Sequence, residues 1–134
     1  MAAEPDRIVT EERSHQDPID RTVLDGLHRL HREGRPDIAK TVIMLFLEGT
    51  PPVVDDLEQA AARNDAGSLC RASHILLSSG AAVGAVLLSS RCKDLEALAR
   101  SGSVPADATA RIREIRPLYA EAESALRGWC AGRP

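Results

Sequence analysis

Apolar residues recur at steps of three and four along most of the chain, which is the spacing of one face of an α-helix. This pattern begins at Ile19 and continues to about Arg127. No segment alternates apolar and polar residues over a useful length, as a half-buried strand would. The breaks between the helical segments are short, so neighbouring helices should run antiparallel. The pattern predicts an all-α bundle.

Glycine and proline divide the first half of this pattern. Gly34 is placed to end a first helix that starts near Ile19, and Pro36 lies where a first-turn proline of the second helix belongs. The run Gly49–Pro52 predicts a break, followed by a third helix over 53–61. Three carboxylates near the start of that helix would complement its dipole: Asp55, Asp56 and Glu58.

Polar caps and a loop divide the second half. Asn64 and Asp65 are good N-caps for a fourth helix that runs through Val83. A fifth helix is expected over about 85–100, a loop over 101–106, and a last helix from Ala108. Residues 1–17 are polar and acidic, which predicts a disordered tail. We therefore expect a helical domain over 18–128 and a C-terminal tail over 129–134.

Composition excludes several classes of function. The 134 residues are 43% hydrophobic, enough for one domain with its own core, but only 2% aromatic. So few aromatic rings cannot form a stacking surface for single-stranded nucleic acid. The net charge of −3 leaves no dominant basic stripe for a phosphate backbone. Three cysteines fit neither a disulfide framework nor a zinc motif, which indicates a reducing, cytoplasmic setting.

A membrane span is not expected either. The longest uncharged stretch, 75–90, has 16 residues and contains four serines. A spanning helix needs roughly 20 predominantly apolar residues. The acidic stretch 1–18 also lacks the apolar segment of a signal peptide.

Among the polar side chains, His74 stands out by its position on the fourth helix. With about 100° per residue, Leu69, Ala72, Leu76 and Val83 fall within about 40° of the side opposite His74. That side is the expected core face, so the imidazole should point outward, as a nucleophilic histidine requires. The neighbours on its own side are Cys70, Arg71, Leu77, Ser78 and Ala81.

The other histidines and cysteines suggest less. His28 and His31 are expected on the solvated side of the first helix, and His15 lies in the tail. Cys70 and His74 are one helical turn apart, but a metal site needs three or four ligands, and no further Cys or His is placed nearby. We expect no metal site and no bound cofactor in this chain.

The segment around His74 resembles the motif of histidine-containing phosphotransfer (HPt) domains, roughly A-H-x-L-K-G-S-S-x-x-[IVL]-G-A. The sequence RASHILLSSGAAVGA occupies 71–85, and the similarity continues downstream and covers about 18–127. The matching residues are His74, Leu76, Ser79, Val83, Gly84, Ala85, Cys92, Leu95, Glu96 and Arg100.

The resemblance implies an up-down antiparallel four-helix bundle with one or more short additional N-terminal helices. It implies reversible phosphoryl transfer in a phosphorelay, with His74 as acceptor and donor. The partner would be a response-regulator receiver domain, a hybrid sensor histidine kinase, or both, and the receiver would bring Mg²⁺. No ATP-binding motif is present, so we expect an intermediate without kinase activity of its own. One closed bundle also predicts a monomer.

Two departures from the family motif matter. Leu77 stands where the family usually has a lysine that supports the phosphoryl group, and Ser78 stands where it usually has a glycine that leaves room for the receiver. Arg71 lies one turn before His74 and could supply the missing cation. In this interpretation Cys70, Leu77, Ser78 and Ala81 form the docking surface.

Two alternatives remain open from the sequence. The first is a phosphotransfer-like interaction module that docks a receiver or another partner without accepting phosphate. The second is a plain helical adaptor in which the histidine is incidental.

Overall fold

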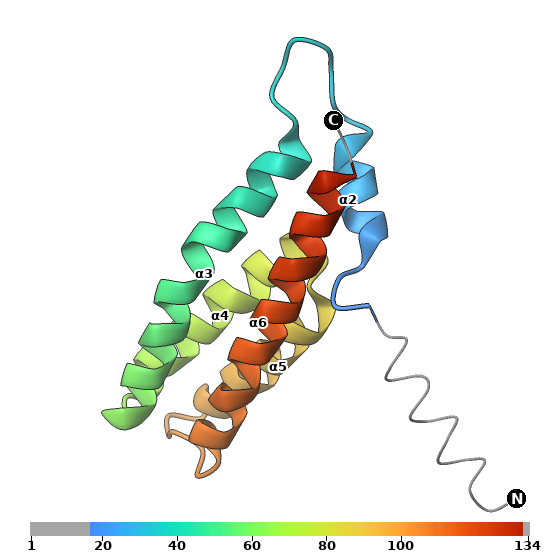
Figure 1. Ribbon diagram of the computed structural model, residues 1–134. Coiled ribbons are helices and arrows are strands. Elements are labelled where there is room, and N and C mark those ends of the chain that lie inside the picture. The colour runs from blue at the N-terminus through green and yellow to red at the C-terminus, as the bar shows by residue number, and fades with distance from the viewer. Residues whose placement is uncertain (1–16, 133–134) are drawn as a thin grey trace, which may run out of the picture.

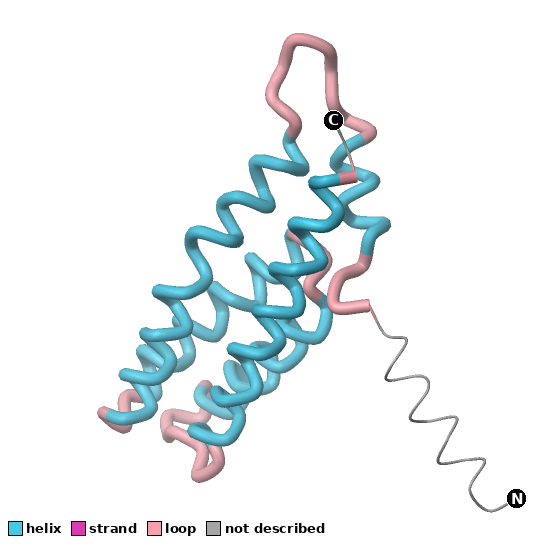
Figure 2. The backbone as a smooth tube through the Cα atoms, in the orientation of Figure 1, coloured by secondary structure: helices cyan, strands magenta, loops and turns pink. Residues whose placement is uncertain are grey.

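The computed structural model describes residues 17–132, and within this range the chain forms five helices and no strand. The short α2 spans Arg21–His28, and the four long helices are α3 (Ile38–Ala62), α4 (Ala66–Ala82), α5 (Val86–Ala99) and α6 (Ala108–Ala131). Figures 1 and 2 show the long helices side by side, with α2 at the end of the bundle where α6 finishes. The all-α prediction is confirmed. The expected tail lies outside the described residues except for Asp17.

The four long helices form a closed ring. Helix α3 packs against α4 and α6, and α5 packs against the same two helices, while α2 contacts α3. Short connections at 63–65, 83–85 and 100–107 reverse the chain between successive long helices. This is the up-down antiparallel bundle that the resemblance implies. No helix within 17–132 has the length and apolar character needed to cross a bilayer.

Aspartates cap three helix N-termini. The carboxylates of Asp20, Asp37 and Asp65 each accept a hydrogen bond from a backbone amide in the first turn of α2, α3 and α4. In Asp20 and Asp65 the first cause of a lowered pKa is a side-chain hydrogen bond, from Thr22 and Ser68 respectively, because these bonds favour the ionised carboxylate. The cap predicted at Asp65 is confirmed.

The break predicted at Gly49–Pro52 is wrong, because α3 continues through both prolines. Pro51 has no N–H to donate to the Leu47 carbonyl one turn earlier. That carbonyl instead accepts a hydrogen bond of 2.9 Å from the hydroxyl of Tyr119 on α6. Burial raises the pKa of Tyr119, so the hydroxyl stays protonated and able to donate. A partner on another helix thus replaces the bond that proline removes.

The carboxylates expected near the start of a third helix therefore lie in the middle of α3. Asp55 and Glu58 pair with Arg116 of α6, whose guanidinium is 2.6 Å and 2.7 Å from their oxygens. Asp56 is exposed beside them. The three carboxylates therefore do not complement a helix dipole, and Asp55 and Glu58 instead form a salt-bridge cluster with Arg116 between α3 and α6.

Two predicted helix ends are also wrong. Helix α2 ends at His28, well before Gly34, which lies in the following turn with a φ of 78°. The segment 31–36 has no apolar residue to bury, so nothing favours extending the helix. At the other end, α6 continues to Ala131, and Trp129 is only 1% exposed. The predicted boundary at 128 would remove this buried side chain from the domain.

Gly84 joins the start of the domain to the turn between α4 and α5. Its φ is 78°, and a Cβ added there would lie 2.5 Å from the Asp20 carbonyl oxygen. The Asp20 N–H donates a hydrogen bond of 2.6 Å to the Gly84 carbonyl, and the next residue, Ala85, is fully buried. This Gly-Ala pair of the motif therefore has a structural role.

Candidate functional site

His74 lies in the middle of α4, on the face opposite the core. Leu69 and Leu76 are fully buried and Ala72 nearly so, whereas the His74 side chain is 64% exposed. This is the orientation that the helical wheel predicts. Because α4 is packed along its length by α3 and α5, the imidazole is presented on a rigid element.

Glu96 of α5 fixes the inner side of the imidazole. Its side chain is 10% exposed, and its Oε2 lies 2.6 Å from Nδ1 of His74. A carboxylate can only accept, so Nδ1 of the neutral ring carries the proton in this geometry. The lone pair of the ring then resides on Nε2, as in other histidines whose second nitrogen is held by a carboxylate. The pair therefore leaves Nε2 as the ring nitrogen with the available lone pair.

Arg100 holds the other oxygen of the same carboxylate. Its Nη2 is 2.9 Å from Oε1 of Glu96, one helical turn along α5. Both oxygens of this nearly buried group are thus paired, as burial of a charge requires. Glu96 and Arg100 both match the family pattern, but their sequence positions alone indicate no role for either. The only local signal is a carboxylate directly after the buried Leu95.

Arg71 and the expected docking residues around the imidazole differ in their contacts and in their exposure. The Arg71 Nη2 donates a 3.1 Å hydrogen bond to Ser68, toward the start of α4, although its side chain borders a hollow with His74 and Glu96. Ser78 and Ala81 are exposed, and Cys70 is half-buried.

Leu77 differs from the expectation of an exposed side chain. It is half-buried and packed against the core. The exposed apolar residue beside the imidazole is instead Ile75, with an exposed fraction of 51%. Ile75 borders the same hollow, and sequence reasoning assigned it no part in docking.

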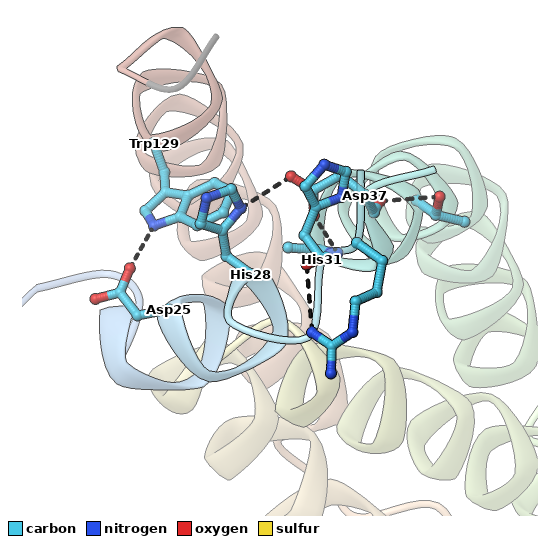
Figure 3. Close-up of polar contacts among 8 residues, drawn as sticks. Asp25, His28, His31, Asp37 and Trp129 are labelled. Atoms are coloured by element: carbon cyan, nitrogen blue, oxygen red, sulfur yellow. Dashed lines mark hydrogen bonds and ion pairs between the residues drawn. The ribbon is translucent and has the colours of Figure 1, made fainter. Parts of the chain in front are cut away.

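A second histidine–carboxylate pair, His28 and Asp37, lies at the end of the bundle where α2 packs (Figure 3). His28 is half-buried, with Nδ1 3.0 Å from Oδ2 of Asp37 and its ring edge-on to Trp129 at 5.8 Å. His31 is exposed and stacks on His28 at 6.0 Å. The expected solvated position is therefore wrong for His28, because Trp129 of α6 covers it, and correct for His31.

The environment of Asp37 shifts its pKa in opposite directions. Desolvation raises the pKa, but hydrogen bonds from His28 and the Ala39 amide lower it, as do the charges of His28 and His31. The net pKa lies below the ordinary value of 3.8. Asp37 thus remains ionised while it caps α3 and holds His28.

Among residues 17–132, no group of three or more His, Cys, Asp or Glu side chains is placed to hold a metal ion.

Known proteins resemble this chain in fold and in sequence. Histidine-containing phosphotransfer protein B from Pseudomonas aeruginosa PAO1 has a similar crystal structure, with a TM-score of 0.77 and 24% identity over 87% of this chain and 97% of that chain. At that identity the likeness shows the fold. A search of curated proteins finds no match. The Hpt domain family matches residues 41–127, a range that includes His74, Glu96 and Arg100. The chain belongs to the Hpt domain family.

Proposed function

We propose that the protein relays a phosphoryl group between receiver-domain aspartates through Nε2 of His74. The observation that carries this proposal is the exposed imidazole whose Nδ1 is held by Glu96 at 2.6 Å. Family membership and the bundle fold support the same function. The partners would be a response-regulator receiver domain, a hybrid sensor histidine kinase, or both.

The transfer step uses the lone pair on Nε2. Nε2 attacks the phosphorus of the receiver's aspartyl phosphate, an N–P bond forms, and the P–O bond to the aspartyl carboxylate breaks with its electron pair on that oxygen. The proton on Nδ1 stays in place, and the positive charge that develops on the ring faces the Glu96 carboxylate. Such transfers depend mainly on positioning and charge stabilisation. The receiver would supply Mg²⁺.

Arg71 is the proposed auxiliary cation for the phosphoryl group. Its side chain is exposed and borders the hollow beside His74, so it can turn from Ser68 toward a phosphoryl group on the ring. A guanidinium pairs well with phosphoryl oxygens. The docking surface would comprise Ser78 and Ala81, the half-buried Cys70 and Leu77, and the exposed Ile75.

A binding-only module is the second candidate, and two observations favour it. Leu77, at the usual lysine position, packs against the core and brings no charge to the site. Ser78 is exposed at the usual glycine position, where it narrows the approach of a receiver.

If steric room limits transfer, Ser78→Gly should raise the rate of phosphoryl transfer despite a helix cost of about 1 kcal/mol.

The test is transfer from phosphorylated receivers to the parent protein, His74→Gln and His28→Gln, with folding of each checked by circular dichroism. We expect acid-labile, base-stable phosphate on the parent and on His28→Gln, and none on His74→Gln. A parent that binds a receiver but takes phosphate from none of those tested would support the binding-only module instead.

A further inference from the structure

The Glu96 carboxylate contacts both His74 and Arg100, one through each of its oxygens. Oε2 lies 2.6 Å from the imidazole, and Oε1 lies 2.9 Å from the guanidinium. The carboxylate itself is 10% exposed, whereas the Arg100 side chain is 69% exposed at the end of α5. Arg100 thus reaches from solvent to the side of Glu96 that faces away from the imidazole.

This arrangement restricts how the carboxylate can turn. With Arg100 on Oε1, the remaining oxygen is directed at Nδ1 of His74. Without the guanidinium, Oε1 loses its charged partner, and the carboxylate can rotate to seek solvent or another donor. The imidazole would then lose the acceptor that keeps its proton on Nδ1, and tautomers with the proton on Nε2 would become populated.

We propose that Arg100 is a positioning residue for phosphoryl transfer, acting through Glu96 to keep the lone pair of His74 on Nε2. This inference rests on the proposed function of His74. Arg100 touches neither the imidazole nor the attacking nitrogen, so its contribution is to the orientation of the carboxylate. The proposal differs from the role of Arg71, which would contact the phosphoryl group itself.

The Arg100 side chain itself is mostly exposed, so its removal opens no cavity in the core and should leave the bundle folded. Arg91 offers a matched control. It lies on the same helix and makes an ion pair of 3.3 Å with Glu114, a contact between α5 and α6 that does not involve the site. Arg91→Ala therefore removes one arginine and one ion pair without changing Glu96.

The experiment measures imidazole ¹⁵N shifts of neutral His74 at alkaline pH, together with phosphotransfer rates, in the parent, Arg100→Ala, Arg100→Lys and Arg91→Ala. We expect the Nδ1–H tautomer to dominate in the parent and in Arg91→Ala. Arg100→Ala should show mixed tautomers and a transfer rate about tenfold lower, with partial recovery in Arg100→Lys. In a Glu96→Ala background, which has no side chain to link the two residues, Arg100→Ala should have no further effect on the tautomer.

Unchanged ¹⁵N shifts in Arg100→Ala would overturn the positioning role. A further tautomer change on removing Arg100 from the Glu96→Ala variant would also contradict it, because Arg100 would then act without the side chain of residue 96. The two proposals can fail separately. If Arg100→Ala changes the tautomer as expected while the parent accepts no phosphate, the positioning of the ring stands and the relay function is wrong.

Discussion

The protein holds two histidine–carboxylate pairs with similar polar geometry and different surroundings. His74 and Glu96 are 2.6 Å apart, and His28 and Asp37 are 3.0 Å apart. In both pairs Nδ1 faces a carboxylate that is about one-tenth exposed. The His74 side chain is 64% exposed, however, whereas that of His28 is 38% exposed and lies between Trp129 and His31.

Under the proposed function, the exposure of the ring, and not a carboxylate partner alone, would separate a phosphoryl acceptor from a structural histidine. Both pairs hold one ring nitrogen, but only His74 presents the rest of its ring on the outer face of a long helix. The ring of His28 closes the end of the bundle, where α2, α3 and α6 meet (Figure 3). Under the proposed function, the first pair serves chemistry and the second serves stability.

Among the substitutions that test this comparison, one at Trp129 should have the largest effect on stability. Trp129→Ala should lower the free energy of unfolding by about 3–5 kcal/mol, because it empties a buried site and removes the ring against which His28 packs. Urea denaturation followed by circular dichroism measures this loss. A loss below about 1 kcal/mol would show that the end of the bundle does not depend on this cluster.

The two histidines should differ in their own contributions to stability. His28→Gln should cost about 1–2 kcal/mol, because it removes a ring contact with Trp129 and a hydrogen bond to the ionised Asp37. His74→Gln should change stability by less than about 0.5 kcal/mol, since the ring is mostly exposed. Equal losses in the two variants, measured by urea denaturation, would break the comparison.

A smaller effect on stability is expected at acid pH, from protonation of Asp37. The pKa of Asp37 in the folded state lies below the ordinary value of 3.8, so its contribution to stability is present above 3.8 and is lost as the pH falls through the lowered value. Asp37→Asn should therefore reduce the loss of stability between neutral pH and values below 3.8. Urea denaturation of both proteins across that range is the measurement. Identical pH profiles would remove Asp37 from the explanation.

Much of the fold was predictable because local signals agreed with the packing. The periodic apolar residues predicted the helices, and Asp65 predicted the start of α4. Pro51 misled the prediction because the group that compensates for it, the Tyr119 hydroxyl, is 72 residues in sequence from the Leu47 carbonyl that it contacts. The segment after His28 was similarly misjudged, since its only strong stop signal, Gly34, follows the actual helix end.

The site was predictable in part. The wheel placed His74 outward because its own helix determines that face. The partner Glu96 depends on how α4 and α5 are aligned side by side, which no spacing within either helix reveals. The same holds for the cover that Trp129 provides to His28, because it comes from the opposite end of the chain.

The central claim is that His74, and not His28, carries the phosphoryl group on Nε2. The most direct measurement is ¹⁵N and ³¹P NMR of the protein after transfer from a phosphorylated receiver, with histidine labelled by ¹⁵N. The account predicts one phosphohistidine, with the N–P coupling at Nε2 of His74 and the His28 resonances unchanged. Phosphate on Nδ1 of His74, or on His28, would contradict it.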